Sequence, residues 1–223
     1  MRVATGEAPT GSSVAETSAT AAPSPEPVDA LVDFEALQAE NPDAYSWIDI
    51  PGAGISTAVL QSPADDAYYL THLIDGTRSY PGSAFTEMAN AKDYSDPVTV
   101  IYAHDDDSLF KFLHDYEDAG FFEANPYFYI YLPGRRLTYE VASAYKADDR
   151  HILNTHDFSS VEERESYFAS VLDPASSLRN VRQGVTLDAD SRIVQLSTCM
   201  LDEVHGSSRY LVTGVLVDER PTR

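Results

Sequence analysis

One cysteine occurs in the 223 residues, and it ends an apolar run that favours a β-strand, Ile193–Cys199. Ten residues later Arg209 opens a second apolar run, Tyr210–Val217. A thiol at one strand end beside a guanidinium at the next strand start is a candidate nucleophile with a cation at hand, because the thiolate attacks and positive charge stabilises it. Free cysteine is also among the most buried residue types, so core packing is the competing interpretation.

A histidine partner for Cys199 is suggested by the middle of the chain. His104 follows the strand-like run Val98–Ala103 and precedes three aspartates, Asp105–Asp107. We expect His104 at a strand-to-loop edge, where functional residues are often built, and we expect the aspartates to form a solvated loop. His114 is expected on a helix surface. The other histidines are expected in exposed, polar surroundings: His72, His151, His156 and His205.

Short apolar runs bounded by Gly, Pro and Asp predict a mainly β fold, a sandwich or barrel of seven to eight strands. The predicted strands are 47–50, 56–60, 98–104, 127–132, 137–145, 193–199 and 210–217. Helical spacing of apolar residues predicts helices over Ser108–Tyr116 and Val161–Leu172. A short N-terminal helix capped by Asp33 is predicted to end at Asn41-Pro42.

Composition narrows the classes of function. The net charge is −21, with 36 acidic and 15 basic residues, which makes nucleic acid and anionic lipid poor partners. One cysteine excludes an intrachain disulfide framework and any multi-cysteine metal site. The histidines lack metal-ligand spacing, and Asp105–Asp107 lack the alternation of a calcium loop. We therefore predict neither a metal nor a cofactor.

The N-terminal residues differ in composition from the rest. Residues 1–28 contain no aromatic residue and no apolar periodicity, so we predict a disordered stalk or linker before a catalytic domain over residues 29–223. No stretch approaches the roughly 20 apolar residues of a membrane span, and no signal peptide is evident. Such a stalk commonly joins a domain to an anchor, so we expect an N-terminal membrane anchor that this chain does not include.

The ordered set of these motifs resembles the class B sortases of Gram-positive bacteria. Leu196–Cys199 is similar to the family's Thr-Leu-x-Thr-Cys signature, with Gln195 where Thr is usual. Arg209 lies at the family's place on the following strand, and Thr99–His104 looks like its strand ending in Tyr-Gly-His.

The resemblance extends upstream and covers about Asp33 to Val217. Asn41–Gly52 resembles the class B entry into the first strand, and Tyr68–Leu70 with Asp75-Gly76 resembles the segment that follows. The predicted helix over residues 161–172 stands where class B carries its extra helix before the cysteine strand. The implied fold is a sortase-type closed β-barrel with an N-terminal helix.

The sequence also departs from the family pattern around the histidine and the cysteine. Ala103 replaces Gly before the histidine, and Asp105 replaces Asn after it. The loop from His104 to Ser108 is short and acidic, and Cys199 is followed by Met200-Leu201 rather than by an acidic residue.

The resemblance implies a cysteine transpeptidase at the extracellular face of the membrane. Cys199 would form a thioester with a sorting signal of Asn-Pro-x-Thr type, His104 would be acid and base, and Arg209 would hold a carbonyl or oxyanion. Leu196, Ser197 and Thr198 would contact substrate. The acceptor would be an amine of the cell-wall precursor lipid II, or a pilin lysine.

Two alternatives remain open to the sequence, and a third is disfavoured. A weakly active or inactive sortase fold could act as a peptide-binding module, and a pilin polymerase could share the same motifs. A papain-like protease is disfavoured because its cysteine would stand at a helix start before its histidine. Here His104 precedes a cysteine at a strand end.

Overall fold

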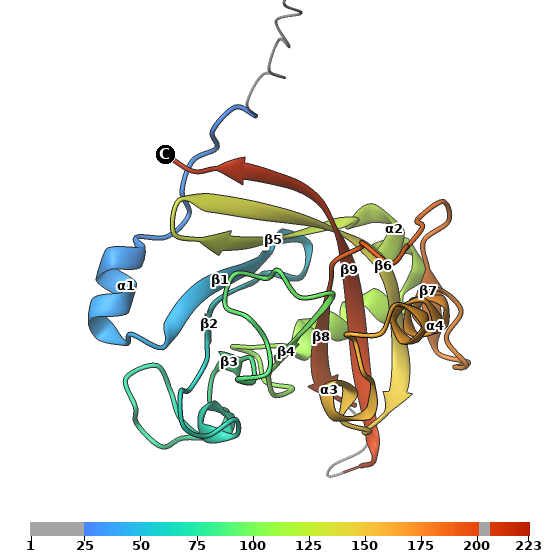
Figure 1. Cartoon of the computed structure of the whole chain (residues 1–223). Coiled ribbons are helices and arrows are strands. Elements are labelled where there is room, and N and C mark those ends of the chain that lie inside the picture. Colours follow the sequence, from blue (N-terminus) through green and yellow to red (C-terminus); the bar gives the residue numbers. More distant parts are fainter. Residues whose placement is uncertain (1–24, 201–205) are drawn as a thin grey trace, which may run out of the picture.

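Strands curve round a common interior in the computed structural model, which describes residues 25–200 and 206–223 (Figure 1). Most of these strands form where apolar residues alternate with other residues and turn residues stand at both ends. The strands in these residues are β1 (Ala44–Ile50), β2 (Ile55–Leu60), β3 (Ala84–Phe85), β4 (Val98–Tyr102), β5 (Tyr127–Leu132), β6 (Arg135–Asp148), β7 (Arg179–Val181), β8 (Ile193–Cys199) and β9 (Ser208–Pro221).

One sheet closes on itself as a barrel. Its order is β5-β1-β2-β3-β4-β8-β9-β6-β7, and β5 also pairs with β6. That pairing joins eight strands in a ring and leaves β7 outside it, on β6. Most neighbours are antiparallel, but β2 runs parallel to β3 and β4 runs parallel to β8. The predicted closed barrel of seven to eight strands is confirmed.

Short helices cover parts of the barrel. They are α1 (Phe34–Glu40), η1 (Pro51–Ala53), η2 (Tyr68–Leu70), η3 (Lys111–Glu117), α2 (Ala119–Ala124), α3 (Ile152–Thr155) and α4 (Val161–Leu172), of which the η elements are 3-10 helices. The Asp33 side chain caps α1 by accepting a hydrogen bond from the Ala36 amide at 3.1 Å. The predicted N-terminal helix and the helix before the cysteine strand are both confirmed.

The helix predicted over Ser108–Tyr116 is wrong in type and position. The chain forms the 3-10 helix η3, which begins at Lys111. Before it, the Asp106 carboxylate accepts hydrogen bonds from the amide and hydroxyl of Ser108. Backbone bonds in this segment span three residues, from the Leu109 amide to the Asp106 carbonyl and from the Leu113 amide to the Phe110 carbonyl, which is the 3-10 pattern.

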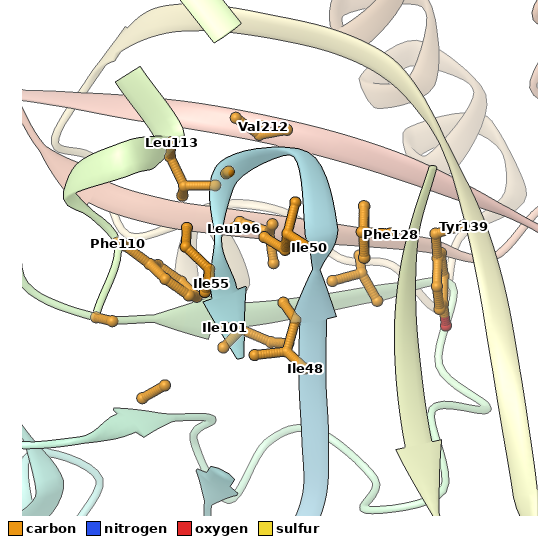
Figure 2. Close-up of a cluster of buried hydrophobic side chains, with 14 of the residues drawn as sticks. Ile48, Ile50, Ile55, Ile101, Phe110, Leu113, Phe128, Tyr139, Leu196 and Val212 are labelled. Atoms are coloured by element: carbon orange, nitrogen blue, oxygen red, sulfur yellow. The ribbon is translucent and has the colours of Figure 1, made fainter. Parts of the chain in front are cut away.

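Two apolar clusters lie on opposite faces of the strands that carry the site. The barrel interior holds Ile101 of β4 and Leu196 of β8, together with Ile48 and Val212 (Figure 2). The outer face of the same strands packs Val100 and Ile193 against Phe168 and Val171 of α4. Because strand side chains alternate, one residue in two on β8 points away from the barrel core.

Backbone pairing begins close to the predicted domain boundary. The Val28 amide donates to the Pro221 carbonyl at 3.0 Å, and the Arg223 amide donates to the Val28 carbonyl at 3.1 Å. In Figure 1 this segment runs beside the end of β9. Residues 1–24 lie outside the described residues, so the stalk remains a prediction there. In the described chain no helix has the length and apolarity to cross a membrane.

Candidate active site

His104 and Cys199 end neighbouring parallel strands. The β4–β8 register runs from Val98 opposite Ile193 to Tyr102 opposite Ser197. Beyond the ladder, the Ala103 amide still donates to the Ser197 carbonyl at 3.2 Å. Two residues beyond the last pair of these strands, His104 therefore lies level with Cys199.

Arg209 stands on the other side of Cys199. β8 and β9 are antiparallel, and Cys199 is the direct partner of Arg209 in their register. Directly opposed residues of an antiparallel pair send their side chains to the same face. The three predicted residues therefore lie in a row across β4, β8 and β9, and all three line one cavity of about 440 Å³.

Two contacts orient the His104 ring. Its Nε2 lies 3.0 Å from the Leu70 carbonyl oxygen. A carbonyl only accepts, so Nε2 carries the proton of this bond and Nδ1 is the nitrogen left for chemistry. The Tyr80 ring lies against the imidazole with centroids 4.6 Å apart, and Tyr80 itself is largely exposed.

The acidic loop after His104 was predicted to be solvated, and the structure adds local contacts that hold it. Hydrogen bonds from Ser108 hold the pKa of Asp106 below its usual value. Asp107 pairs with Lys111 at 2.5 Å. The Oδ1 atom of Asp105 is buried, with no hydrogen bond among the described residues. Partial burial raises the pKa of Tyr80, and the neighbouring Cys199 and Asp105 add to this, so its phenol stays neutral near pH 7.

The Arg209 guanidinium is held near the start of its own strand. Its Nη1 donates to the carbonyls of Ser208 at 2.9 Å and Gly206 at 3.3 Å. These bonds keep a permanent cation beside Cys199, since arginine does not lose its proton in proteins. A cation here can stabilise a thiolate or the oxyanion of a tetrahedral intermediate.

Of the three residues predicted to contact substrate, two line the cavity and one does not. Ser197 and Thr198 line the cavity, and the buried Thr198 Oγ1 has no hydrogen bond among the described residues. Leu196 does not line the cavity: its side chain is fully buried in the barrel core (Figure 2). The prediction for Leu196 is corrected, because strand alternation turns it to the face opposite Ser197 and Cys199.

The cavity wall includes residues that the sequence did not single out. His151 is exposed as expected, and it also lines the cavity with Glu87, whose Oε1 lies 2.7 Å from the His151 Nε2. Tyr102 also lines it, and burial and the nearby Glu87 raise the pKa of that phenol. No spacing in the sequence links these residues, since Glu87 and His151 come from distant segments that meet only in the fold.

His114 is another correction. It was expected on a helix surface, but its side chain is only 5% exposed. Its Nε2 lies 2.9 Å from the carbonyl oxygen of Cys199. The helical pattern did not indicate this burial, because it comes from packing against β9, where the His114 ring stacks on Tyr210.

Gln195, which departs from the family signature, has a structural explanation. It is fully buried, and its Oε1 accepts a hydrogen bond from the Tyr167 hydroxyl of α4 at 2.5 Å. Its Nε2 donates to Thr213 Oγ1 on β9 at 3.1 Å. The amide thus joins the cysteine strand to the helix that covers it and to the arginine strand.

The arrangement can support nucleophilic catalysis at a carbonyl. It provides a partly exposed thiol, a histidine with one nitrogen available and a fixed cation around one cavity. Among the described residues no three His, Cys, Asp or Glu side chains gather in a way that could hold a metal ion. A thiol, an imidazole and a fixed cation at one cavity are the groups of an enzyme that forms a covalent acyl intermediate on cysteine.

Comparisons with known proteins agree with that class. The Sortase domain model matches residues 48–217. Sortase B of Listeria monocytogenes serovar 1/2a is 28% identical over 183 residues, which are 81% of this chain and 72% of the relative. The X-ray structure of a mutant form of Clostridium perfringens sortase B superposes with a TM-score of 0.74 at 28% identity, covering 83% of this chain and 86% of that chain.

A third structure, the Staphylococcus aureus sortase B–substrate complex, has a TM-score of 0.72 at 24% identity and covers 83% of this chain and 84% of that chain. The chain belongs to the sortase family, and its resemblance to class B is confirmed. It is an enzyme, a cysteine transpeptidase.

Proposed function

We propose that this transpeptidase cleaves a sorting signal of Asn-Pro-x-Thr type in secreted proteins and joins the new carboxyl end to an amine of the cell wall. The single observation that carries the chemistry is the row of His104, Cys199 and Arg209 along one cavity. The substrate class rests on the likeness to class B sortases, one of which is described in a complex with its substrate.

The first half of the reaction would make a thioester. The Cys199 thiolate attacks the carbonyl carbon of the scissile peptide bond, and Arg209 stabilises the oxyanion. The carbon–nitrogen bond then breaks, and the imidazolium of His104 gives a proton to the leaving amine. The leaving fragment departs as a neutral amine, and the acyl group stays on sulfur.

The second half would resolve the thioester. A neutral amine of the acceptor attacks the same carbonyl carbon, and His104 takes up the proton that the amine loses. The carbon–sulfur bond breaks, which restores the thiolate–imidazolium pair. A lipid II amine is the proposed acceptor, and a pilin lysine is the alternative that the same chemistry allows.

We propose that the enzyme acts at the extracellular face of the membrane, where secreted substrates and cell-wall precursors are found. A membrane anchor would hold it there, with the low-complexity N-terminal residues as the stalk. Both statements follow from the proposed substrates.

The substrate is tested by incubating the protein with an Asn-Pro-x-Thr peptide and with a scrambled peptide, and by measuring intact mass. We expect an acyl adduct with the first peptide only and none in Cys199→Ala. An adduct that persists in Cys199→Ala would exclude this nucleophile, and equal adducts with both peptides would exclude the proposed signal.

The acceptor is tested by adding triglycine or Nα-acetyl-lysine to the thioester-forming reaction. Triglycine has the free main-chain amine of a cell-wall-type peptide, whereas acetyl-lysine offers only a side-chain amine. Faster product formation with triglycine supports the cell-wall acceptor, and faster formation with acetyl-lysine supports a pilin acceptor instead.

A further inference from the structure

His114 lies directly behind the nucleophile and takes no part in the chemistry above. Its Nε2 is 2.9 Å from the carbonyl oxygen of Cys199, and its Nδ1 is 2.6 Å from Oε1 of Glu117. The ring stacks on Tyr210 with centroids 4.8 Å apart. His114 does not line the catalytic cavity, so it meets Cys199 from the side away from the substrate.

Both partners of this imidazole are oxygen atoms, which limits where the protons can be. The Cys199 carbonyl can only accept, so Nε2 must carry a proton. A bond of 2.6 Å between Nδ1 and a carboxyl oxygen also needs a proton. The unit is therefore either an imidazolium with a carboxylate or a neutral imidazole with a carboxylic acid.

The surroundings keep this unit in place. Asn180 of β7 donates to the carbonyl oxygens of Tyr116 and Glu117, which pins the end of η3. Tyr210 of β9 faces the ring, and burial together with the nearby Glu117 raises the pKa of its phenol, so it remains neutral. The Glu117 side chain is about one-third exposed.

We propose that His114 is a positioning residue for Cys199, held by Glu117, and that its hydrogen bond fixes the peptide group at the end of β8. The orientation of that carbonyl sets the backbone torsion of Cys199, and with it the direction of the thiol toward His104 and Arg209. A strand end needs such a bond because the β8–β9 ladder has its last pair at Cys199 and Arg209. The inference rests on Cys199 as the nucleophile of the proposed function.

The test is the second-order rate of Cys199 alkylation by iodoacetamide, together with kcat and KM for the sorting peptide. His114→Leu should slow alkylation and lower kcat by about 10- to 100-fold, because a misplacement near 1 Å is enough for such a loss. KM should change less than about twofold, since the ring is outside the cavity.

Conservative variants separate positioning from structure. His114→Gln keeps a donor for the Cys199 carbonyl and should recover most of the rate. Glu117→Gln can donate to Nδ1 of a neutral imidazole and should stay within about threefold of the wild type, whereas Glu117→Leu should be slow. Because Glu117 is partly exposed, these two variants keep the test valid if His114→Leu fails to fold.

A matched control lies elsewhere in the chain. His156 also pairs through Nδ1 with a glutamate, Glu163, at 2.6 Å, and packs on an aromatic ring, Tyr167. His156 is paired with Glu163 and not with Cys199, so His156→Leu should leave alkylation unchanged. Wild-type alkylation rates in His114→Leu and Glu117→Leu would overturn the proposal, as would a His114→Gln variant as slow as His114→Leu.

A failure of the proposed function gives a different result. If wild-type Cys199 alkylates no faster than a free thiol of a small peptide, Cys199 is not an activated nucleophile. In that case the proposed function fails at its first step, whatever the His114 variants show.

Discussion

The two sides of Cys199 are built in different ways. On one side, Arg209 is fixed by the β8–β9 ladder, in which it is the direct partner of Cys199. On the other side, His104 stands beyond the last ladder pair of β4 and β8. It depends on the Leu70 carbonyl and the Tyr80 ring for its orientation.

This difference separates the rigid part of the site from the adjustable part. Backbone ladder bonds pair Cys199 with Arg209, and the His114 side chain supports the Cys199 carbonyl where the ladder ends. His104 is placed by side-chain contacts from segments distant in sequence, so substitutions in those segments should alter its position. We therefore expect substitutions on the loop side to have graded effects on activity. On the ladder side, we expect effects from the reactive groups themselves and from His114.

The largest effect is expected on the loop side, from His104 itself. His104→Ala removes the acid and base, so kcat/KM for the sorting peptide should fall by about 10²- to 10⁴-fold. Thermal unfolding should change little, because the ring is exposed at the cavity. A variant that keeps more than a tenth of the activity would show that another group moves the proton.

On the ladder side, Arg209→Ala should lower kcat by about 10²- to 10³-fold, the usual loss for one oxyanion donor. Arg209→Lys keeps the charge but not the planar fork, so its loss should be smaller. Circular dichroism and thermal unfolding serve as controls, because the backbone pairs of β9 do not need the guanidinium. Equal kcat in both variants and the wild type would remove Arg209 from the mechanism.

Removing the aromatic contact that orients His104 should have a smaller effect on activity. Tyr80→Ala removes an aromatic partner worth about 0.5–1.5 kcal/mol, so kcat/KM should fall by about two- to tenfold. Tyr80→Phe keeps the ring and is the matched control, expected near wild-type activity since the phenol is neutral. If Tyr80→Phe loses as much as Tyr80→Ala, the hydroxyl rather than the ring is what matters.

The smallest effect comes from the loop after His104 and depends on pH. Hydrogen bonds from Ser108 lower the pKa of Asp106 in the folded state. That stabilisation is present above the unfolded pKa of about 3.9 and is lost as pH falls through the folded value. Ser108→Ala should lower the melting temperature by about 1–2 °C at pH 6, since the bond is exposed and worth about 0.5 kcal/mol. The difference should shrink toward pH 3.

The control is Ser159, which makes the same two bonds to Asp157 at 3.0 and 2.6 Å. Ser159→Ala should reproduce the stability change without affecting kcat, whereas Ser108→Ala should also reduce kcat slightly. Equal kcat values for the two variants would mean that the loop does not influence His104.

Much of the barrel could be predicted because its strands are locally encoded. The predicted strands over residues 127–132 and 193–199 match β5 and β8, and the helix over residues 161–172 matches α4. The short strands β3 and β7 were missed because two or three residues carry no periodicity. The 3-10 helix η3 was predicted as α-helix because both present apolar residues at similar spacing.

The site was predicted in part for the same reason. Cys199, His104 and Arg209 each end or begin an apolar run, so the sequence marks them. Leu196 was assigned to the substrate because of its place in a motif, but strand alternation sends it into the core. His114 and His151 are set by contacts with Cys199 and Glu87, which are far away in the chain.

The sequence by itself therefore determined where the longer strands form and which reactive residues stand near their ends. Alternation and turn residues act over a few positions, and this is enough to specify a strand. Only the tertiary structure decided that β4 lies parallel to β8 with His104 level with Cys199, and that His114 supports Cys199 from behind. Those choices depend on which surfaces pack together in the closed barrel, and no local pattern carries that information.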